Sequence, residues 1–292
     1  MCKLKKLLSI LIALSLFTTA TLPVFASPNA PTYNPILEKI GITEDAFWAM
    51  PPEKRVFYQD VQEITSISSS TKYYKLEEVS CETENLLSDP IEVTEKEYVN
   101  ATTPTIQQAR AVGDLIDTDE ASGTWYKMTT TVSEMAVTSG ERHLYVANRI
   151  ELNQYAMGIL NTGRSGFLGV SLNSNTSPIS GSEMLTLEFS YITEPEKRYT
   201  YYYDTAPYKG CGYAFDIGVG PGTDRRIYTM TFMAMPNTSA SLTVFEGYGF
   251  AGYWTGSLSA SINIGPFGSI TFGSTSNVVR ANNTHAQIYL NR

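Results

Sequence analysis

Apolar and polar positions alternate with a period of two over much of the second half of the chain, which is the pattern of half-buried β-strands. Leu144, Val146, Ile150 and Leu152 share one face of such a run. Similar runs lie at 185–191, 213–219, 227–235, 242–244, 258–264 and 286–290, with turn-forming sequences between them. About eight to ten strands without helical stretches between them predict a mainly β protein, an antiparallel β-sandwich with a barrel as the alternative.

Helical signals precede this region and predict a small helical N-terminal segment within residues 27–65. Asn34 is an N-cap followed by proline, Gly41 ends the first helix, and Thr43 begins a second one with acidic residues in its first turn. A third helix is expected from Pro52, carrying Val56, Phe57 and Val61 before Ile64. The apolar residues of these helices are too few for an independent core, so we expect the segment to pack on another part of the chain.

Residues 66–120 are polar and acidic, and they predict a largely irregular connector with one or two short strands. The sequence "SISSST", which begins at Ser66, is typical of a flexible joint. Composition then shifts toward Thr, Ser, Tyr and Gly, which places the β-sandwich domain at 121–292.

The first 26 residues have the organisation of a secretory signal peptide. Lysines are followed by the apolar stretch "LLSILIALSLF" and by a small-residue cleavage site that ends at Ala26. Cys2 lies before the apolar stretch and would leave with the signal. No later run is long and apolar enough to span a bilayer, so we expect a secreted, extracellular protein without a stable membrane anchor.

Net charge and cysteine content limit which ligands and cofactors the chain is expected to bind. The formal net charge is −8, and the acidic residues concentrate before residue 120, so the sequence predicts no binding to nucleic acid. Cys81 and Cys211 could form a disulfide in an oxidising compartment or remain two separate thiols. Two thiols alone make a poor metal site, and we expect no metal and no cofactor.

Catalytic motifs are missing from the sequence. The chain has two histidines and no H-E-x-x-H, G-x-S-x-G or P-loop sequence. A glycan hydrolase needs only two carboxylates, and Asp216 and Glu246 are preferred because each interrupts an apolar, aromatic stretch. No catalytic residue is assigned: whether the chain is an enzyme stays uncertain, and the missing motifs favour a non-enzyme.

Tyrosines are the most conspicuous candidates for ligand contact. Tyr199, Tyr201 and Tyr203 lie on one face of a strand and Tyr202 on the other, and Trp254 is a further candidate. Such rings suit stacking on sugars, but they are equally typical of cross-strand packing inside a sheet. Both interpretations stay open.

Residues 255–276 alternate Ser, Thr or Asn with apolar residues around a Gly-Pro-Phe-Gly turn. This pattern is that of an amphipathic hairpin, which a pore-forming protein could insert into a membrane. An ordinary sandwich hairpin has the same alternation.

The sequence "SGTWYKMTTTVSEM" together with "YVANRIELN" resembles a loose group of uncharacterised exported β-rich proteins of Gram-positive bacteria, and the matching residues are Trp125, Met128, Thr129, Thr130, Arg149 and Glu151. Leu152 stands where those proteins usually have a second tryptophan. The resemblance implies export and a β fold, and it implies no activity.

The sequence as a whole favours a secreted, non-enzymatic β-sandwich that binds a glycan or a protein partner at or outside the cell envelope. A membrane-active pore-forming protein and a secreted glycan hydrolase are the two alternatives. Neither the ligand nor the oligomeric state follows from the sequence.

Overall fold

The computed structural model describes residues 31–76, 78–81, 84–87, 90–102, 124–152, 165–172, 176–191, 194–202, 212–216, 223–236, 244–254, 262–264, 270–272 and 278–290. The chain divides into two compact units, Met1–Thr32 and Tyr33–Arg292, and the second unit holds all the elements below.

The helices of the described residues are η1 (Pro35–Ile40), α2 (Glu44–Ala49), α3 (Pro52–Arg55) and α4 (Glu95–Thr102). The strands of the first half are β1 (Val61–Leu76), β2 (Glu78–Cys81), β3 (Glu84–Leu87), β4 (Ile91–Val93), β5 (Thr124–Val137) and β6 (Arg142–Leu152). They are followed by β7 (Ser165–Leu172), β8 (Thr176–Pro178), β9 (Met184–Tyr191), β10 (Glu194–Tyr202), β11 (Gly212–Asp216) and β12 (Thr223–Pro236). The last strands are β13 (Val244–Trp254), β14 (Ile262–Ile264), β15 (Ile270–Phe272), β16 (Val278–Arg280) and β17 (Thr284–Tyr289).

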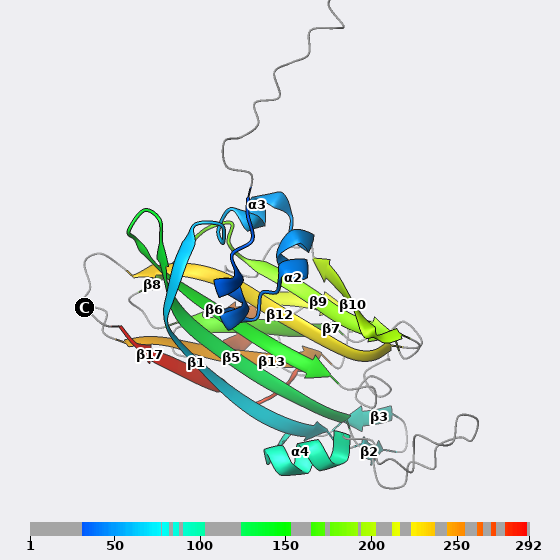
Figure 1. The fold of residues 1–292 in the computed structure, drawn as a ribbon. Helices are drawn as coiled ribbons and strands as arrows, with labels where there is room; N and C mark the ends of the chain where they lie inside the picture. Colours follow the sequence, from blue (N-terminus) through cyan, green and yellow to red (C-terminus); the bar gives the residue numbers. More distant parts are fainter. Residues whose placement is uncertain are drawn as a thin grey trace, which may run out of the picture. The chain divides into compact units, whose positions relative to one another are not determined.

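Two antiparallel sheets pack face to face, so the predicted sandwich is confirmed. The large sheet has the order β10-β9-β12-β6-β5-β1-β4, with β8 added beside β12. The small sheet has the order β11-β7-β13-β16, with β17 paired to β13. Figure 1 shows β13 and β17 behind the long green and yellow strands of the large sheet.

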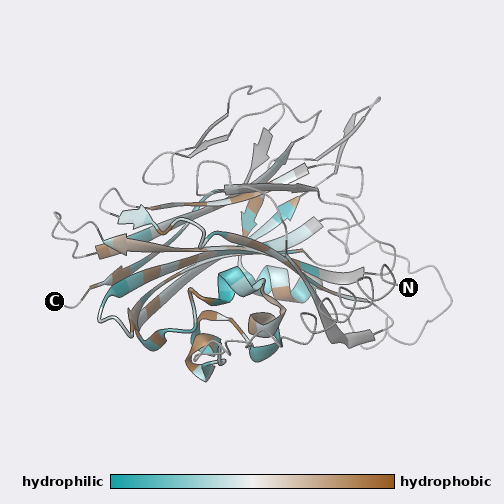
Figure 2. Ribbon diagram, turned by 90° about the horizontal axis from the view of Figure 1, so that it is seen from above, coloured by the Kyte–Doolittle hydropathy of each residue, from teal (hydrophilic) through white to brown (hydrophobic). Residues whose placement is uncertain are grey.

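The core between the sheets, here called the sandwich core, is built from alternate residues of the strands. Figure 2 shows the alternation as bands of different hydropathy along the ribbon. Leu144, Val146 and Leu152 are buried there with Ile150 packed against them, and Leu185 and Leu187 join from β9, as the period-two pattern predicted. The large sheet thus directs one set of side chains toward the small sheet.

The other face of the large sheet is covered in part by the N-terminal helices, here called the cap (Tyr33–Tyr58). A second core forms beneath them, and it joins Leu37 and Phe47 of the cap to Met135, Tyr145 and Met233 of the sheet. Lys54 Nζ donates to the carbonyl oxygens of Gly181 and Glu183, at 2.7 Å each. The expectation that the helical segment packs on another part of the chain is therefore confirmed.

The cap begins and ends its helices where the capping residues predict. Asn34 Oδ1 accepts from the Ile36 amide, Gly41 has a φ of 83° after η1, and Thr43 Oγ1 accepts from the Ala46 amide. Asn34 also donates its side-chain amide to Val61 O at 2.8 Å, which ties the cap to β1. The third helix is shorter than expected: α3 ends at Arg55, and a strand begins at Val61.

The prediction of a flexible joint at "SISSST" is wrong. These residues belong to β1, which pairs with β5 along almost its whole length. Serine and threonine are tolerated because their hydroxyls bond across the strands: Ser69 to Thr131 at 2.8 Å and Thr71 to Thr129 at 2.9 Å. The part of the expected connector at 66–76 is therefore a strand of the large sheet.

A polar cluster interrupts the sandwich core and joins the two sheets. Asn148 Nδ2 donates to Gly169 O and Phe250 O, both at 2.9 Å and both in the small sheet. Beside it, the hydroxyls of Thr130 and Thr284 bond to each other across the sheets. Gly249 lies directly against this cluster, because a Cβ there would come within 1.8 Å of Thr130 Oγ1.

We expect Asn148→Leu to lower the free energy of unfolding by about 3 kcal/mol, because two buried carbonyl oxygens lose their donor. Urea denaturation measures the change. Gln287→Leu, which removes an exposed amide from β17, is the matched control and should change stability by less than about 0.5 kcal/mol. Equal losses in the two variants would contradict a special role for the buried amide.

The expected hairpin near residues 255–276 is present in its backbone, where Ile262–Ile264 pairs with Ile270–Phe272. The rest of this stretch and the side chains of both strands lie outside the described residues, so membrane insertion stays a prediction. Within the described ranges, every helix is too short or too polar to cross a bilayer.

Candidate functional site

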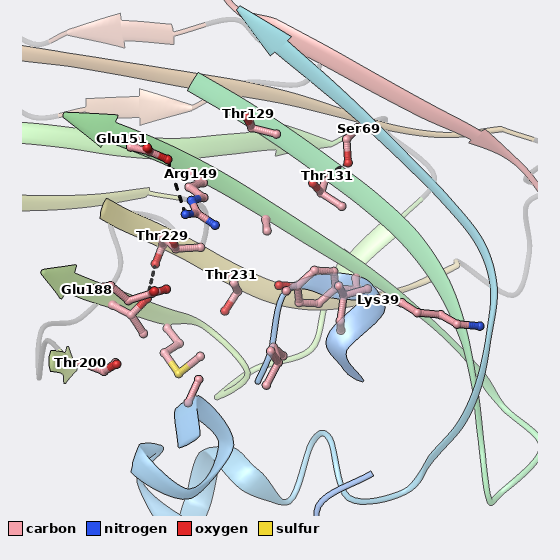
Figure 3. A pocket seen from close by; sticks show the side chains of 18 of the residues that line it. Lys39, Ser69, Thr129, Thr131, Arg149, Glu151, Glu188, Thr200, Thr229 and Thr231 are labelled. Carbon is pink, nitrogen blue, oxygen red and sulfur yellow. Dashed lines mark hydrogen bonds and ion pairs between the residues drawn. The ribbon is translucent and has the colours of Figure 1, made fainter. Parts of the chain in front are cut away.

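A groove of about 320 Å³ opens on the outer face of the large sheet, at the edge of the cap. Strands β1, β5, β6, β12, β9 and β10 form its floor. Residues of η1 and α2 form one wall, among them Lys39, Ile40, Ile42, Ala46 and Met50. Figure 3 shows the floor side chains rising from the strands toward the cap.

The floor is a grid, because the strand register aligns residues of six strands in rows. The first row lies nearest the second core beneath the cap and consists of Ser69, Thr131, Ala147, Thr231 and Met184. The second row is Thr71, Thr129, Arg149, Thr229, Thr186 and Tyr202. The third row is Tyr73, Lys127, Glu151, Ile227, Glu188 and Thr200. The number of charged side chains therefore rises from the cap outward. The first row has none, the second has Arg149, and the third has Lys127, Glu151 and Glu188.

Threonine suits this floor for two reasons. Its branched side chain favours the strand conformation, and its hydroxyl offers a donor and an acceptor to the groove. Thr129, Thr131 and Thr229 all line the groove from the middle of their strands. The sheet thus combines strand stability with a hydroxyl-bearing surface.

A buried carboxylate organises the charges of the floor. Glu151 is buried and forms ion pairs with Lys127 at 3.1 Å and with Arg149 at 3.6 Å. Two cations share this one carboxylate, so the three side chains carry a net positive charge. Lys127 is the nearer partner, which leaves the Arg149 guanidinium less tightly held.

Two polar atoms at the groove have no hydrogen-bond partner among the described residues. One is Arg149 Nε, which is buried although the side chain is 37% exposed. The other is Thr231 Oγ1, in a residue that is 4% exposed. Burial raises the pKa of Tyr58, and the nearby Thr231 hydroxyl offsets part of that rise. The two hydroxyls still form no well-aligned hydrogen bond. Figure 3 shows Thr229 and Thr231 along β12 and Arg149 on the neighbouring strand.

Tyr202 closes the groove at the β10 side. Its hydroxyl donates to Ala46 O at 2.6 Å and so connects the sheet to α2. Burial raises the pKa of this tyrosine above its usual value, and the nearby Tyr58 and Glu188 add to the rise. The phenol therefore stays neutral and holds its hydrogen bond at physiological pH.

The tyrosines chosen from the sequence are not the ones that the described site contains. The backbone pairs Tyr199 with Phe189 and Tyr201 with Leu187, and the side chains of both tyrosines lie outside the described residues. Tyr203 and the side chain of Trp254 lie outside them as well. Tyr202, on the opposite face of the strand, lines the groove instead. A ligand role for the predicted residues stays a prediction.

Glu246, one of the two carboxylates preferred for the hydrolase hypothesis, does not line the groove. Glu246 lies on β13 of the small sheet, with its Oε1 3.3 Å from His285 Nε2 and 3.3 Å from the Tyr248 hydroxyl. The side chain of Asp216 lies outside the described residues, as do Cys211 and the side chain of Cys81, so their pairing stays a prediction. In the described parts of the chain, no group of three or more His, Cys, Asp or Glu side chains could hold a metal ion.

No protein-family model matches this chain, and no curated protein matches it. Among solved structures, the chain is similar to the collagen-binding domain of a Staphylococcus aureus adhesin, with a TM-score of 0.26 and 7% identity over 50% of this chain and 88% of that one. Fap1 fimbriae of Streptococcus parasanguinis give a TM-score of 0.26 and 12% identity over 55% and 79%. The full-length major pilin RrgB of Streptococcus pneumoniae gives 0.27 and 8% over 77% and 56%. These neighbours are surface proteins of Gram-positive bacteria, but TM-scores this low establish no common fold.

Proposed function

We propose that this protein is a non-enzymatic binding protein, exported from the cell, that holds a segment of a carbohydrate chain in the groove between the cap and the large sheet. The groove carries the proposal: its floor presents hydroxyls in register, and its cap wall presents apolar side chains. A sugar ring offers hydroxyls at its edge and C–H groups on its face, so the two walls fit its two kinds of surface. The volume of about 320 Å³ is at the lower end of ligand sites and suits one or two sugar units.

Thr229→Val should weaken oligosaccharide binding by about tenfold, because valine keeps the shape and the strand preference of threonine but removes one hydroxyl from the floor. Isothermal titration against cell-wall and host oligosaccharides measures the loss. Thr138→Val, in the exposed turn between β5 and β6, is the control and should bind like the parent protein. If none of these oligosaccharides binds the parent protein, the proposed function is wrong.

Glycan hydrolysis is a second candidate function, and one observation favours it. Glu151 and Glu188 occupy the same row of the groove floor and are separated by the β12 residue Ile227. Two strand spacings place their backbones about 10 Å apart, which is near the carboxyl separation of inverting glycosidases. A reducing-end assay after incubation separates the two functions: the proposed binding protein leaves the oligosaccharide intact.

A further inference from the structure

The charges of the groove differ in sign from those of the chain as a whole. The chain has a formal net charge of −8, whereas the groove is lined by Lys39, Lys127 and Arg149 against Glu151 and Glu188. Glu151 is already shared between two of the cations. A locally positive groove in an acidic protein attracts an anionic ligand, while the rest of the surface repels it.

The Arg149 guanidinium is a positively charged hydrogen-bond donor suited to an anion. Its Nε is buried and has no partner among the described residues, so the N–H bond lacks an acceptor. Its ion pair with Glu151 is 3.6 Å long, which is beyond hydrogen-bond distance. When its Nε–H is free, a guanidinium can donate two parallel hydrogen bonds, one to each oxygen of a carboxylate.

The neighbours of Arg149 complete the site. Thr229 is its direct partner across the strands, and Thr231 lies one position further along the same face of β12. The Thr231 hydroxyl is nearly buried and has no partner in the described structure, so it can donate to the same ligand. The unused hydrogen-bonding groups of the floor therefore gather around one arginine.

We propose that the groove recognises an acidic sugar, a uronic acid within a carbohydrate chain, whose carboxylate binds Arg149. This inference rests on the proposed function, because it assumes that the occupant is a carbohydrate, and it adds the charge of that carbohydrate. Arg149 supplies the two-donor contact, Thr229 and Thr231 supply hydroxyls around it, and Lys127 shares the Glu151 carboxylate with Arg149.

Oligogalacturonate and its methyl ester test the inference, since the ester has the same ring without the charge. Isothermal titration should show the acid binding at least about tenfold more tightly than the ester, and the difference should shrink as salt rises. Arg149→Gln should abolish the preference. Lys72→Gln, which removes one positive charge from an ion pair with Glu92 away from the groove, should retain it.

Glu151→Gln gives a second test, in which the expected result is a gain of preference for the acid and not a loss of binding. It releases both cations from their shared carboxylate, so the ratio of affinity for the acid to affinity for the ester should rise severalfold. Circular dichroism of each variant checks that the fold is retained. Equal binding of acid and ester would overturn the inference and leave the proposed function standing. Absence of binding to any carbohydrate would overturn both, and binding of an acidic peptide in preference to the sugars would overturn the choice of ligand.

Discussion

Gly249→Ala is expected to destabilise the protein by about 3 kcal/mol or more, the largest loss from a single methyl group in the described structure. The added Cβ would lie 1.8 Å from Thr130 Oγ1 and 2.7 Å from Asn148 Oδ1. Both atoms belong to the large sheet, and Asn148 is fixed by its hydrogen bonds to the small sheet. The sheets must therefore move apart, or the buried cluster must break.

Urea denaturation of Gly249→Ala is best compared with that of Gly140→Ala. Gly140 has a φ of 78° and open space around its Cβ position, so alanine there meets only backbone strain of about 1 to 2 kcal/mol. Gly249 lies in a strand, and its substitution meets a steric conflict instead. The comparison distinguishes a glycine needed for its positive φ, Gly140, from a glycine needed because a side chain has no room, Gly249.

Thr130→Ala supplies the decisive second variant. It removes the atom nearest to the new methyl group, so the double variant should lose less stability than the sum of the single variants. Strict additivity of the two losses would show that the Thr130 side chain is not what excludes a Cβ at position 249.

Alkaline pH is expected to unfold the protein cooperatively between pH 10 and about 12. Burial raises the pKa of Tyr58 to about 12, and it raises the pKa of Tyr126 and Tyr145 well above the usual value. Burial also raises the pKa of Tyr74 and Tyr202. An unfolded chain releases these protons near pH 10, while the folded protein retains them.

The direction of the effect follows from this difference. Below pH 10 both states hold their phenolic protons, and the stability is unaffected. As the pH rises above 10, the unfolded state ionises first, so the free energy of unfolding falls until the pKa of the folded state is passed. Each pKa unit corresponds to about 1.4 kcal/mol, so the rise in the pKa of Tyr58 to about 12 alone removes roughly 3 kcal/mol of stability, and the other four tyrosines act in the same direction.

Circular dichroism and tyrosinate absorbance, followed against pH, measure this transition. Tyr58→Phe should move the midpoint to higher pH, because it removes one buried phenol whose hydroxyl has no partner among the described residues. Tyr289→Phe is the control, since Tyr289 is 67% exposed and its replacement removes no buried phenol. A gradual rise in tyrosinate absorbance without loss of the dichroism signal would contradict the prediction.

The strands of the sandwich could be predicted from the sequence because each carries its apolar residues at alternate positions. Leu144, Val146, Ile150 and Leu152 were placed on one face, and that face packs in the sandwich core. The position they skip, 148, holds the asparagine that joins the two sheets. A polar residue within a buried alternation was therefore a visible signal of a special contact, although its partners were not.

Strand β1 shows where local pattern is insufficient. Its serines and threonines carry little strand preference by themselves, and they pair because β5 offers matching hydroxyls along the whole strand. The pairing partner lies about sixty residues later in the chain, as for Ser69 and Thr131. Such non-local support is not contained in the composition of the strand.

The groove could not be predicted for a related reason. Its floor takes every second residue of six strands, and its rows exist only once the register between those strands is known. Arg149 and Glu151 were noted in the sequence as residues of a resemblance, and no pattern there assigned them to a shared site. The net negative charge of the chain also concealed the positive groove, since that charge concentrates before residue 120.

The presence of two separate cores has a consequence for how this protein can change over time. The cap wall packs on the second core, which it shares with the outer face of the large sheet, whereas the sandwich core holds the two sheets together. Substitution of the exposed Lys39 alters one side of the groove and changes neither core. A lineage could therefore exchange one ligand for another by varying about two dozen N-terminal residues, while the sandwich that presents them stays constant.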